Sequence, residues 1–277
     1  MKYLFTLFVL LSSILTVGAQ GNGKLFIIGG GNRTVGLMKS LLTTAGLGMN
    51  DYVAVLPMAS SEPDTSYFYF KDDIDKLCAN TIANLNFTPD KINNKVWLDS
   101  LAHAKLIFIC GGDQTRFMNA VLHTPVYAAI HKAYNMGATI SGSSAGAAVM
   151  NKYMITGNEL LGDTTYHETF RKIVTNNTEI KEGLGMLDSV FIDQHFITRS
   201  RYNRIISVLA KYPSFTCIGI DESTAIIVEG RKVTVAGESQ VLVFSQPQGL
   251  SVNAKGQIKW KDVNMSILTA GDVFWIK

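Results

Sequence analysis

The feature that most constrains this chain is residues 142–146, which read Gly-Ser-Ser-Ala-Gly and match the pattern Gly-x-Ser-x-Gly. This pattern is typical of a sharp turn between a strand and a helix, where the serine hydroxyl stands exposed at the end of a sheet. Residues 137–140 are a strand candidate, and the small and apolar residues 145–150 suit a helix start. Glycines permit the turn and let neighbouring backbone come close. We therefore expect an α/β fold with Ser144 as a candidate nucleophile.

Apolar runs alternate with helical stretches along most of the chain. Five of these runs are continuous rather than alternating, which suits parallel strands covered on both faces. The runs are residues 25–28, 52–56, 106–110, 190–192 and 217–220. Helices are expected at residues 126–134, after the start signal Thr124-Pro125, and at residues 201–210. The alternation predicts a doubly wound, mostly parallel sheet.

The last fifty or so residues have a different pattern of short β-rich runs. Strands are expected at residues 225–228, 232–235, 241–244 and 273–276, with hairpin turns at residues 229–231 and 236–238. We interpret this segment as a C-terminal antiparallel β extension of the same domain. Its edge strands are compatible with a homodimer.

The first residues have the composition of a secretory signal peptide. Lys2 precedes the apolar run 4–17, and Val17-Gly18-Ala19 is a small-residue cleavage site before Gln20. The run is too short to span a bilayer comfortably, so we expect no stable membrane anchor. The predicted organisation is a signal peptide at residues 1–19 and a single α/β domain at residues 20–277, in a protein exported to the periplasm or out of the cell.

Composition excludes several classes of function. Hydrophobic residues make up 47% of the chain, which is ample for a core, and the formal net charge is only +3. The chain has no basic block, so nucleic acid is not expected as a partner. Cys78, Cys110 and Cys217 do not form a disulfide framework, and the last two lie in apolar runs where we expect them to be buried. Spacing typical of a zinc site is absent, so no metal is expected.

His195 is the candidate base for Ser144. Ligands of open α/β sheets bind beyond the carboxyl ends of the strands, and His195 follows an apolar run, whereas the other four histidines lie in helical, connecting or loop-like stretches. A serine hydroxyl needs such a base, and the base needs an acid to orient it. Asp193, Asp221 and Glu222 all follow strand candidates, and the pattern does not choose among them.

Three further segments invite a functional interpretation. Backbone N–H groups of Gly112 and Ala145 can form an oxyanion hole beside Ser144. The cluster Arg199, Arg201 and Arg204 can hold carboxylates in fork geometry, although such a cluster is also typical of a solvated helix face.

The third segment, residues 29–34, has the sequence Gly-Gly-Gly-Asn-Arg-Thr, which lacks the last glycine of a dinucleotide-binding motif. No convincing acidic ribose partner follows the next strand candidate. We therefore expect no cofactor.

Taken together, these segments resemble cyanophycinases, within the dipeptidase E family of serine peptidases. The matching residues are 111–114, 142–147, 193–196 with the three arginines, and 219–225. The resemblance implies a glutamine-amidotransferase-like fold and a triad of Ser144, His195 and Glu222, in which it alone selects the acid. It also implies a substrate pocket without metal or organic cofactor. The residues implied to line or support that pocket are Gln114, Asp193, Gln194, Arg199, Arg201 and Arg204.

The resemblance implies an exported serine peptidase acting on cyanophycin, a polyaspartate backbone with arginine joined to each β-carboxyl. The products would be β-aspartyl-arginine dipeptides. In this hypothesis the arginines of the protein hold substrate carboxylates, while Asp193 or Asp113 faces the guanidinium groups of the substrate. Two alternatives stay open: an exported dipeptidase acting on other aspartyl or acidic peptides, and a catalytically silent binder of peptides or polyamides.

Overall fold

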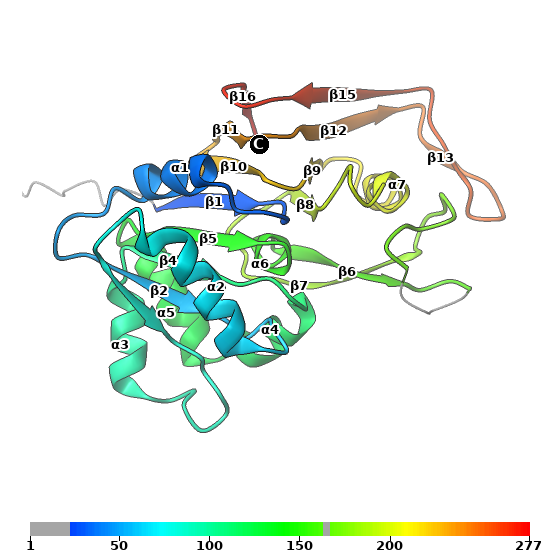
Figure 1. Ribbon diagram of the computed structural model, residues 1–277. Helices are drawn as coiled ribbons and strands as arrows, with labels where there is room; N and C mark the ends of the chain where they lie inside the picture. The colour runs from blue at the N-terminus through cyan, green and yellow to red at the C-terminus, as the bar shows by residue number, and fades with distance from the viewer. Residues whose placement is uncertain (1–22, 163–166) are drawn as a thin grey trace, which may run out of the picture.

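The structure is a computed structural model that describes residues 23–162 and 167–277 (Figure 1). The predicted signal peptide at residues 1–19 lies outside the described residues. Within the described part of the chain, no helix combines the length and the apolar character that a membrane crossing requires.

The central sheet is built from eight strands. These are β1 (Lys24–Ile28), β2 (Tyr52–Leu56), β3 (Thr81–Asn84), β4 (Leu106–Ile109), β5 (Thr139–Ser143), β10 (Thr224–Glu229), β11 (Lys232–Gly237) and β16 (Val273–Trp275). Their order is β16-β11-β10-β1-β5-β4-β2-β3. The strands from β1 to β3 in this order pair in parallel, and β10, β11 and β16 add antiparallel pairs at the other end. This arrangement confirms the predicted fold class.

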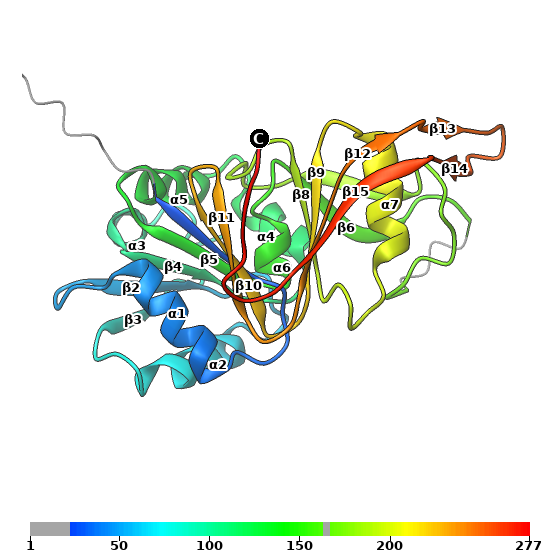
Figure 2. The ribbon, with the colours of Figure 1, turned by 90° about the horizontal axis from the view of Figure 1, so that it is seen from above.

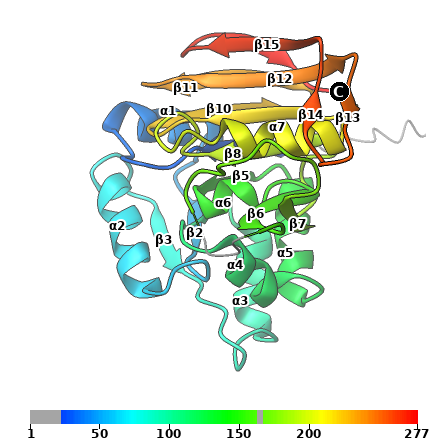
Figure 3. The same ribbon diagram turned by 90° about the vertical axis from the view of Figure 1, so that its right-hand side faces the viewer.

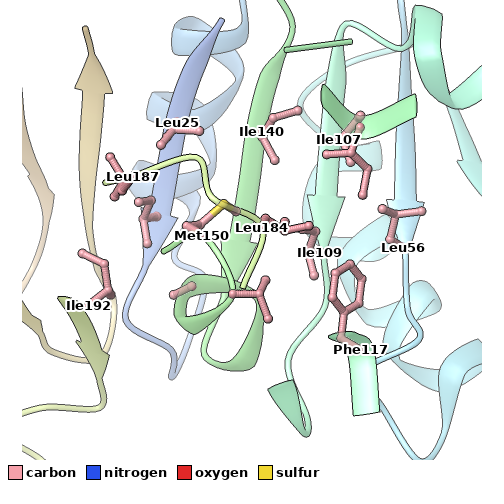
Figure 4. Close-up of a cluster of buried hydrophobic side chains, with 14 of the residues drawn as sticks. Leu25, Leu56, Ile107, Ile109, Phe117, Ile140, Met150, Leu184, Leu187 and Ile192 are labelled. Atoms are coloured by element: carbon pink, nitrogen blue, oxygen red, sulfur yellow. The ribbon is translucent and has the colours of Figure 1, made fainter. Parts of the chain in front are cut away.

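Both faces of the sheet are buried, which explains why its strands read as continuous apolar runs. Phe26 and Ile28 point to one face, covered by α1 (Val35–Ala45) and α2 (Pro63–Asp75). Leu25 and Ile27 point to the other. That second face is covered by α3 (Lys95–His103), α4 (Gln114–Val121) and α5 (Pro125–Asn135). Figure 4 shows part of this second cluster.

A second sheet contains three of the predicted strands, at residues 190–192, 217–220 and 241–244. It consists of β8 (Val190–Gln194), β9 (Thr216–Ile220), β12 (Val241–Gln248) and β15 (Asp262–Leu268), in the order β15-β12-β9-β8. Helix α7 (Tyr202–Lys211), close to the predicted helix at 201–210, packs against it around Phe191 and Ile205 (Figure 3). The runs at 190–192 and 217–220 therefore form strands as expected, but beside the central sheet rather than in it.

One predicted hairpin is wrong. Residues 229–231 do join the paired strands β10 and β11, but residues 236–238 do not join a hairpin. Strand β12 follows β11 in the chain but pairs with β9 instead, with Val241 opposite Ile220. The chain returns from β15 to β16 at the edge of the central sheet (Figure 2). The turn chemistry is local, whereas the choice of partner depends on β9, which lies earlier in the sequence.

Two short ribbons complete the described strands. One pairs β6 (Tyr153–Glu159) with β7 (Thr178–Glu182), and the other pairs β13 (Ser251–Val252) with β14 (Ile258–Lys259). The sequence analysis predicted neither ribbon. Cys110 and Cys217 are buried, as predicted, and burial raises the pKa of the Cys110 thiol to about 12.

Candidate active site

Ser144 occupies the predicted turn between a strand and a helix. It follows β5 directly and precedes α6 (Ala145–Ala148), and its φ of 56° lies in the left-handed region that side chains rarely adopt. A Cβ on Gly142 would lie 2.3 Å from the carbonyl oxygen of Gly146. The two flanking positions therefore need glycine, because backbone crowds around the turn.

The structure brings together the serine, the histidine and the glutamate that the resemblance implied. Ser144 Oγ lies 2.7 Å from His195 Nε2, and His195 Nδ1 lies 2.6 Å from Glu222 Oε1. The three residues follow the ends of β5, β8 and β9, so both sheets contribute to the site. The imidazole is buried and can accept the serine proton while the carboxylate orients it.

Asp221, although adjacent to Glu222, has a structural role. It accepts hydrogen bonds from the backbone N–H groups of Ile197 and Thr198, at 3.0 and 2.9 Å, and from the hydroxyl of Ser239. Burial raises the pKa of Asp221, but these hydrogen bonds outweigh burial and hold the pKa below its ordinary value. Asp221 therefore anchors the segment that follows His195.

The carboxylate of Asp193 is also engaged, in this case by arginine side chains of the protein. It is fully buried, and it accepts two hydrogen bonds from the guanidinium of Arg204, one of them at 2.6 Å from Nε. Arg201 lies 3.6 Å from the same carboxylate and donates to the carbonyl oxygen of Gln194 at 2.7 Å. The hypothesis that Asp193 faces a substrate guanidinium therefore does not fit, and the fork of Arg204 is occupied by a protein carboxylate. Of the three candidate acids, Glu222 is the one that contacts His195.

The glycines at 29–31, which the sequence analysis left without a role, support the triad. An added Cβ on Gly30 would lie 2.3 Å from His195 Cε1, and one on Gly31 would lie 2.6 Å from the Cβ of Glu222. The carbonyl oxygen of Gly29 accepts the N–H of His195 at 2.8 Å. The backbone of the 29–31 loop therefore packs directly against His195 and Glu222, and a side chain at Gly30 or Gly31 would displace them.

The environment of His195 favours the neutral imidazole. Burial lowers its pKa, and the nearby guanidinium groups of Arg199 and Arg201 lower it further, while the hydrogen bond to Glu222 raises it. The net effect is a pKa below the ordinary value. A neutral imidazole is the form that can act as a general base towards Ser144.

We expect activity to persist in mild acid. Because the base must be neutral, activity is lost as the pH falls through the pKa of His195, which lies below about 6.5. Arg199→Gln removes a positive charge that lowers this pKa, so the acid limb of kcat/KM should move to higher pH. The measurement is kcat/KM against pH on an uncharged activated ester, with Lys255→Gln on the β13–β14 ribbon as control. An unmoved limb in Arg199→Gln would contradict this prediction.

The predicted oxyanion-hole residues flank Ser144. A Cβ on Gly112, whose φ is 138°, would lie 2.2 Å from the carbonyl oxygen of Ala59, and the N–H of Asp113 donates to that same oxygen at 2.9 Å. Ala145 opens α6, and the first N–H groups of a helix have no partner within it. The oxyanion hole itself stays a prediction.

A cavity of about 320 Å³ lies beside the serine. It is lined by Gly112, Asp113, Gln114, Ser144, Thr156, Gly157, Asn158, Gln194, Arg199, Arg201 and Arg204. All the predicted pocket residues line it except Asp193, which supports it from behind. Residues 156–158 were missed, because they belong to β6 and no motif marked that strand in the sequence.

Two glutamines of this cavity differ in what they offer a ligand. The Nε2 of Gln114 donates to the carbonyl oxygens of Ile155 and Thr156, at 3.0 and 2.6 Å, so this side chain holds β6 against α4. The Oε1 of Gln194 is buried and has no hydrogen-bond partner among the described residues. A buried acceptor without a donor is costly, and this one belongs to a residue that lines the cavity.

A serine, a histidine and a glutamate in hydrogen-bond contact at strand ends have the arrangement of a serine hydrolase, and the family match makes the chain a serine peptidase. The sequence profile described as peptidase family S51 matches residues 25–236, which include all three. The chain belongs to peptidase family S51.

Named relatives support this assignment. The chain is 29% identical over 235 residues to a protein named cyanophycinase from Geminocystis herdmanii, covering 81% of this chain and 82% of that protein. It is 30% identical over 234 residues to the cyanophycinase of Trichormus variabilis, covering 80% and 74%. A protein named Peptidase E from Actinobacillus pleuropneumoniae is 26% identical over 164 residues, covering 56% and 64%. These matches confirm the resemblance to cyanophycinases.

The fold is shared with solved peptidases. The crystal structure of a peptidase from an acI-B1 Actinobacterium matches with a TM-score of 0.66 and 20% identity, covering 93% of this chain and 98% of that one. At this identity the likeness concerns the fold alone.

Proposed function

We propose that this enzyme is an exported cyanophycinase, which hydrolyses the polyaspartate backbone of cyanophycin to β-aspartyl-arginine dipeptides. The observation that carries the proposal is the polar cavity beside Ser144, which combines guanidinium groups with the unpartnered acceptor of Gln194. Its two kinds of group suit a substrate that carries both carboxylates and N–H donors. The relatives named cyanophycinase, which match most of the chain, support the same substrate.

In the proposed reaction Ser144 Oγ attacks a backbone carbonyl carbon while His195 accepts its proton. The oxygen of the tetrahedral intermediate accepts hydrogen bonds from the N–H groups of Gly112 and Ala145. His195 then gives the proton to the leaving amine, and Glu222 stabilises the imidazolium in between. Water repeats the sequence on the acyl-enzyme and restores the serine.

Substrate recognition is proposed to centre on Arg199 and Gln194. Arg199 lies at the cavity with a side chain that is 31% exposed, and its nearest described carboxylate, Glu168, is 3.7 Å away. A guanidinium so weakly paired is free to bind a substrate carboxylate. Arg201 and Arg204, which are buried beside Asp193, would support the cavity from below.

Release of β-aspartyl-arginine from purified cyanophycin tests the proposal. The protein starting at Gln20 is expected to release the dipeptide, and Ser144→Ala is expected to release none above background. Release from other aspartyl dipeptides but not from cyanophycin would favour the dipeptidase alternative. Binding without hydrolysis by the unaltered protein would instead indicate a silent binder.

Export is part of the proposal, and it depends only on the predicted signal peptide at residues 1–19. Lys2, the apolar run 4–17 and the small residues before Gln20 support it. N-terminal sequencing of the protein recovered outside the cytoplasm of a bacterial host is expected to begin at Gln20. A protein that retained the leader inside the cell would contradict export without affecting the peptidase.

A further inference from the structure

The acidic groups around the cavity are unequal in what they can offer a ligand. Asp193 is paired with arginine, and Glu222 with the catalytic histidine. Asp113 caps α4, where its Oδ1 accepts two backbone N–H groups. Among the described residues, the one cation paired with Glu179, on β7, is Lys181, at 3.6 Å, and the side chain of Lys181 is half-exposed. Such exposed ion pairs are weak, so Glu179 retains most of its negative potential.

Glu179 determines which atoms the wall of the cavity presents. Its Oε2 accepts the hydroxyl proton of Thr156 at 2.6 Å and an amide hydrogen of Asn158 at 2.9 Å. Both of these residues line the cavity. The hydroxyl proton of Thr156 and one of the two amide hydrogens of Asn158 thus go to the carboxylate. The Oδ1 of Asn158 keeps its acceptor capacity, and the Oγ1 of Thr156, which accepts the N–H of Asn158 at 3.3 Å, keeps one lone pair. This part of the wall therefore offers two oxygen acceptors backed by a carboxylate, beside the second amide hydrogen of Asn158.

The charge behind the wall is a true carboxylate. The hydrogen bond from Thr156 lowers the pKa of Glu179, burial opposes it, and the hydrogen bond from Asn158 and the charge of Lys181 lower it further. The wall itself is held in place from the other side, since Gln114 donates to the carbonyl oxygen of Thr156 at 2.6 Å. Together with the unpartnered Oε1 of Gln194, these acceptors match a group that has only donors.

We propose that Glu179 is a specificity-determining residue, which makes the cavity select a substrate unit whose side chain ends in a guanidinium. A guanidinium has five N–H donors, no acceptor and a permanent positive charge, so it complements this wall. The inference rests on the proposed function, and it identifies the protein groups that bind the arginine side chain of the substrate. It assigns to Glu179, Thr156 and Asn158 the role that the sequence analysis gave to Asp193 or Asp113.

The test compares two β-aspartyl substrates that differ only in charge, one carrying arginine and the other citrulline, its neutral isostere. The unaltered enzyme is expected to prefer the arginine substrate. Glu179→Gln should lower kcat/KM for the arginine substrate about tenfold and change that for citrulline by less than about threefold. Circular dichroism and thermal unfolding of Glu179→Gln check that the variant is folded.

Two further variants serve as controls. Lys181→Gln removes the weak partner of Glu179 and should keep or increase the preference for arginine. Asn158→Leu removes one acceptor at an exposed position and should lower the preference in the same direction as Glu179→Gln.

The outcomes separate the inference from the proposed function. If the unaltered enzyme hydrolyses neither substrate, both the proposed function and this inference are overturned. A second outcome is that the unaltered enzyme hydrolyses both substrates while Glu179→Gln lowers kcat/KM equally for the two, or for neither of them. In that case the proposed function stands and the specificity role of Glu179 is wrong.

Discussion

Glu222→Gln is expected to lower kcat by about 10⁴-fold with the fold intact. The amide keeps the shape of the carboxylate, but it neither stabilises the imidazolium nor holds the Nδ1–H tautomer of His195 at the 2.6 Å contact. Glu222 also raises the pKa of His195, so residual activity in the variant should extend to lower pH. Both effects can be read from kcat/KM against pH on an uncharged activated ester, with circular dichroism as the check on folding.

Asp221→Asn is the matched control for this prediction, one residue away in the chain. Asp221 accepts hydrogen bonds from the segment after His195 and does not itself contact the ring. Its variant should lose about 1–3 kcal/mol of stability while the acid limb of activity stays in place. A loss of kcat as large as that of Glu222→Gln, in a protein still folded at the assay temperature, would refute the assignment of Glu222 as the triad acid.

Gly30→Ala is expected to lower kcat by about 100-fold or more. The new Cβ would lie 2.3 Å from His195 Cε1 and 2.5 Å from Nε2, closer than such atoms can approach, so the ring must leave the position in which it contacts Ser144. The φ of 117° at this position adds backbone strain for any residue with a Cβ. Steady-state kinetics on the activated ester measure the loss, and thermal unfolding measures the strain.

Gly46→Ala is the control that separates the effect of the steric clash with His195 from the effect of backbone strain. Gly46 ends α1 with a φ of 60°, and an added Cβ there would meet no atom within 4 Å. This variant should cost about 1 kcal/mol of stability and leave kcat unchanged. Equal activity in the two alanine variants would show that the 29–31 loop does not position the histidine.

Much of the architecture follows from local sequence. The run 52–56 became β2 with the expected bounds, because continuous apolar residues favour a strand buried on both faces. The turn at Ser144 formed because Gly142 and Gly146 tolerate backbone contacts that a Cβ would prevent. Pro125 begins α5 as predicted, since its fixed φ suits the first helical position.

The assignment of roles within the site needed more than local pattern. Asp193, Asp221 and Glu222 are alike in type and in position after a strand, yet they carry three different sets of contacts. Likewise, residues 156–158 entered the cavity wall only because β6 pairs with β7 and is held by Gln114. None of these contacts connects residues close enough in sequence to leave a periodic signal.

By itself, the sequence determined most strands of the two larger sheets, the strand–turn–helix at Ser144 and, through the order of its motifs, the family. These depend on burial patterns and backbone preferences that act over a few residues. Only the tertiary structure showed that Glu222, rather than Asp193 or Asp221, contacts His195, that the glycines at 29–31 lie against His195 and Glu222, and that β8 and β9 belong to a second sheet. Those outcomes depend on which distant segments pack together, because hydrogen bonds and steric contacts act over a few ångströms in space, whatever the separation along the chain.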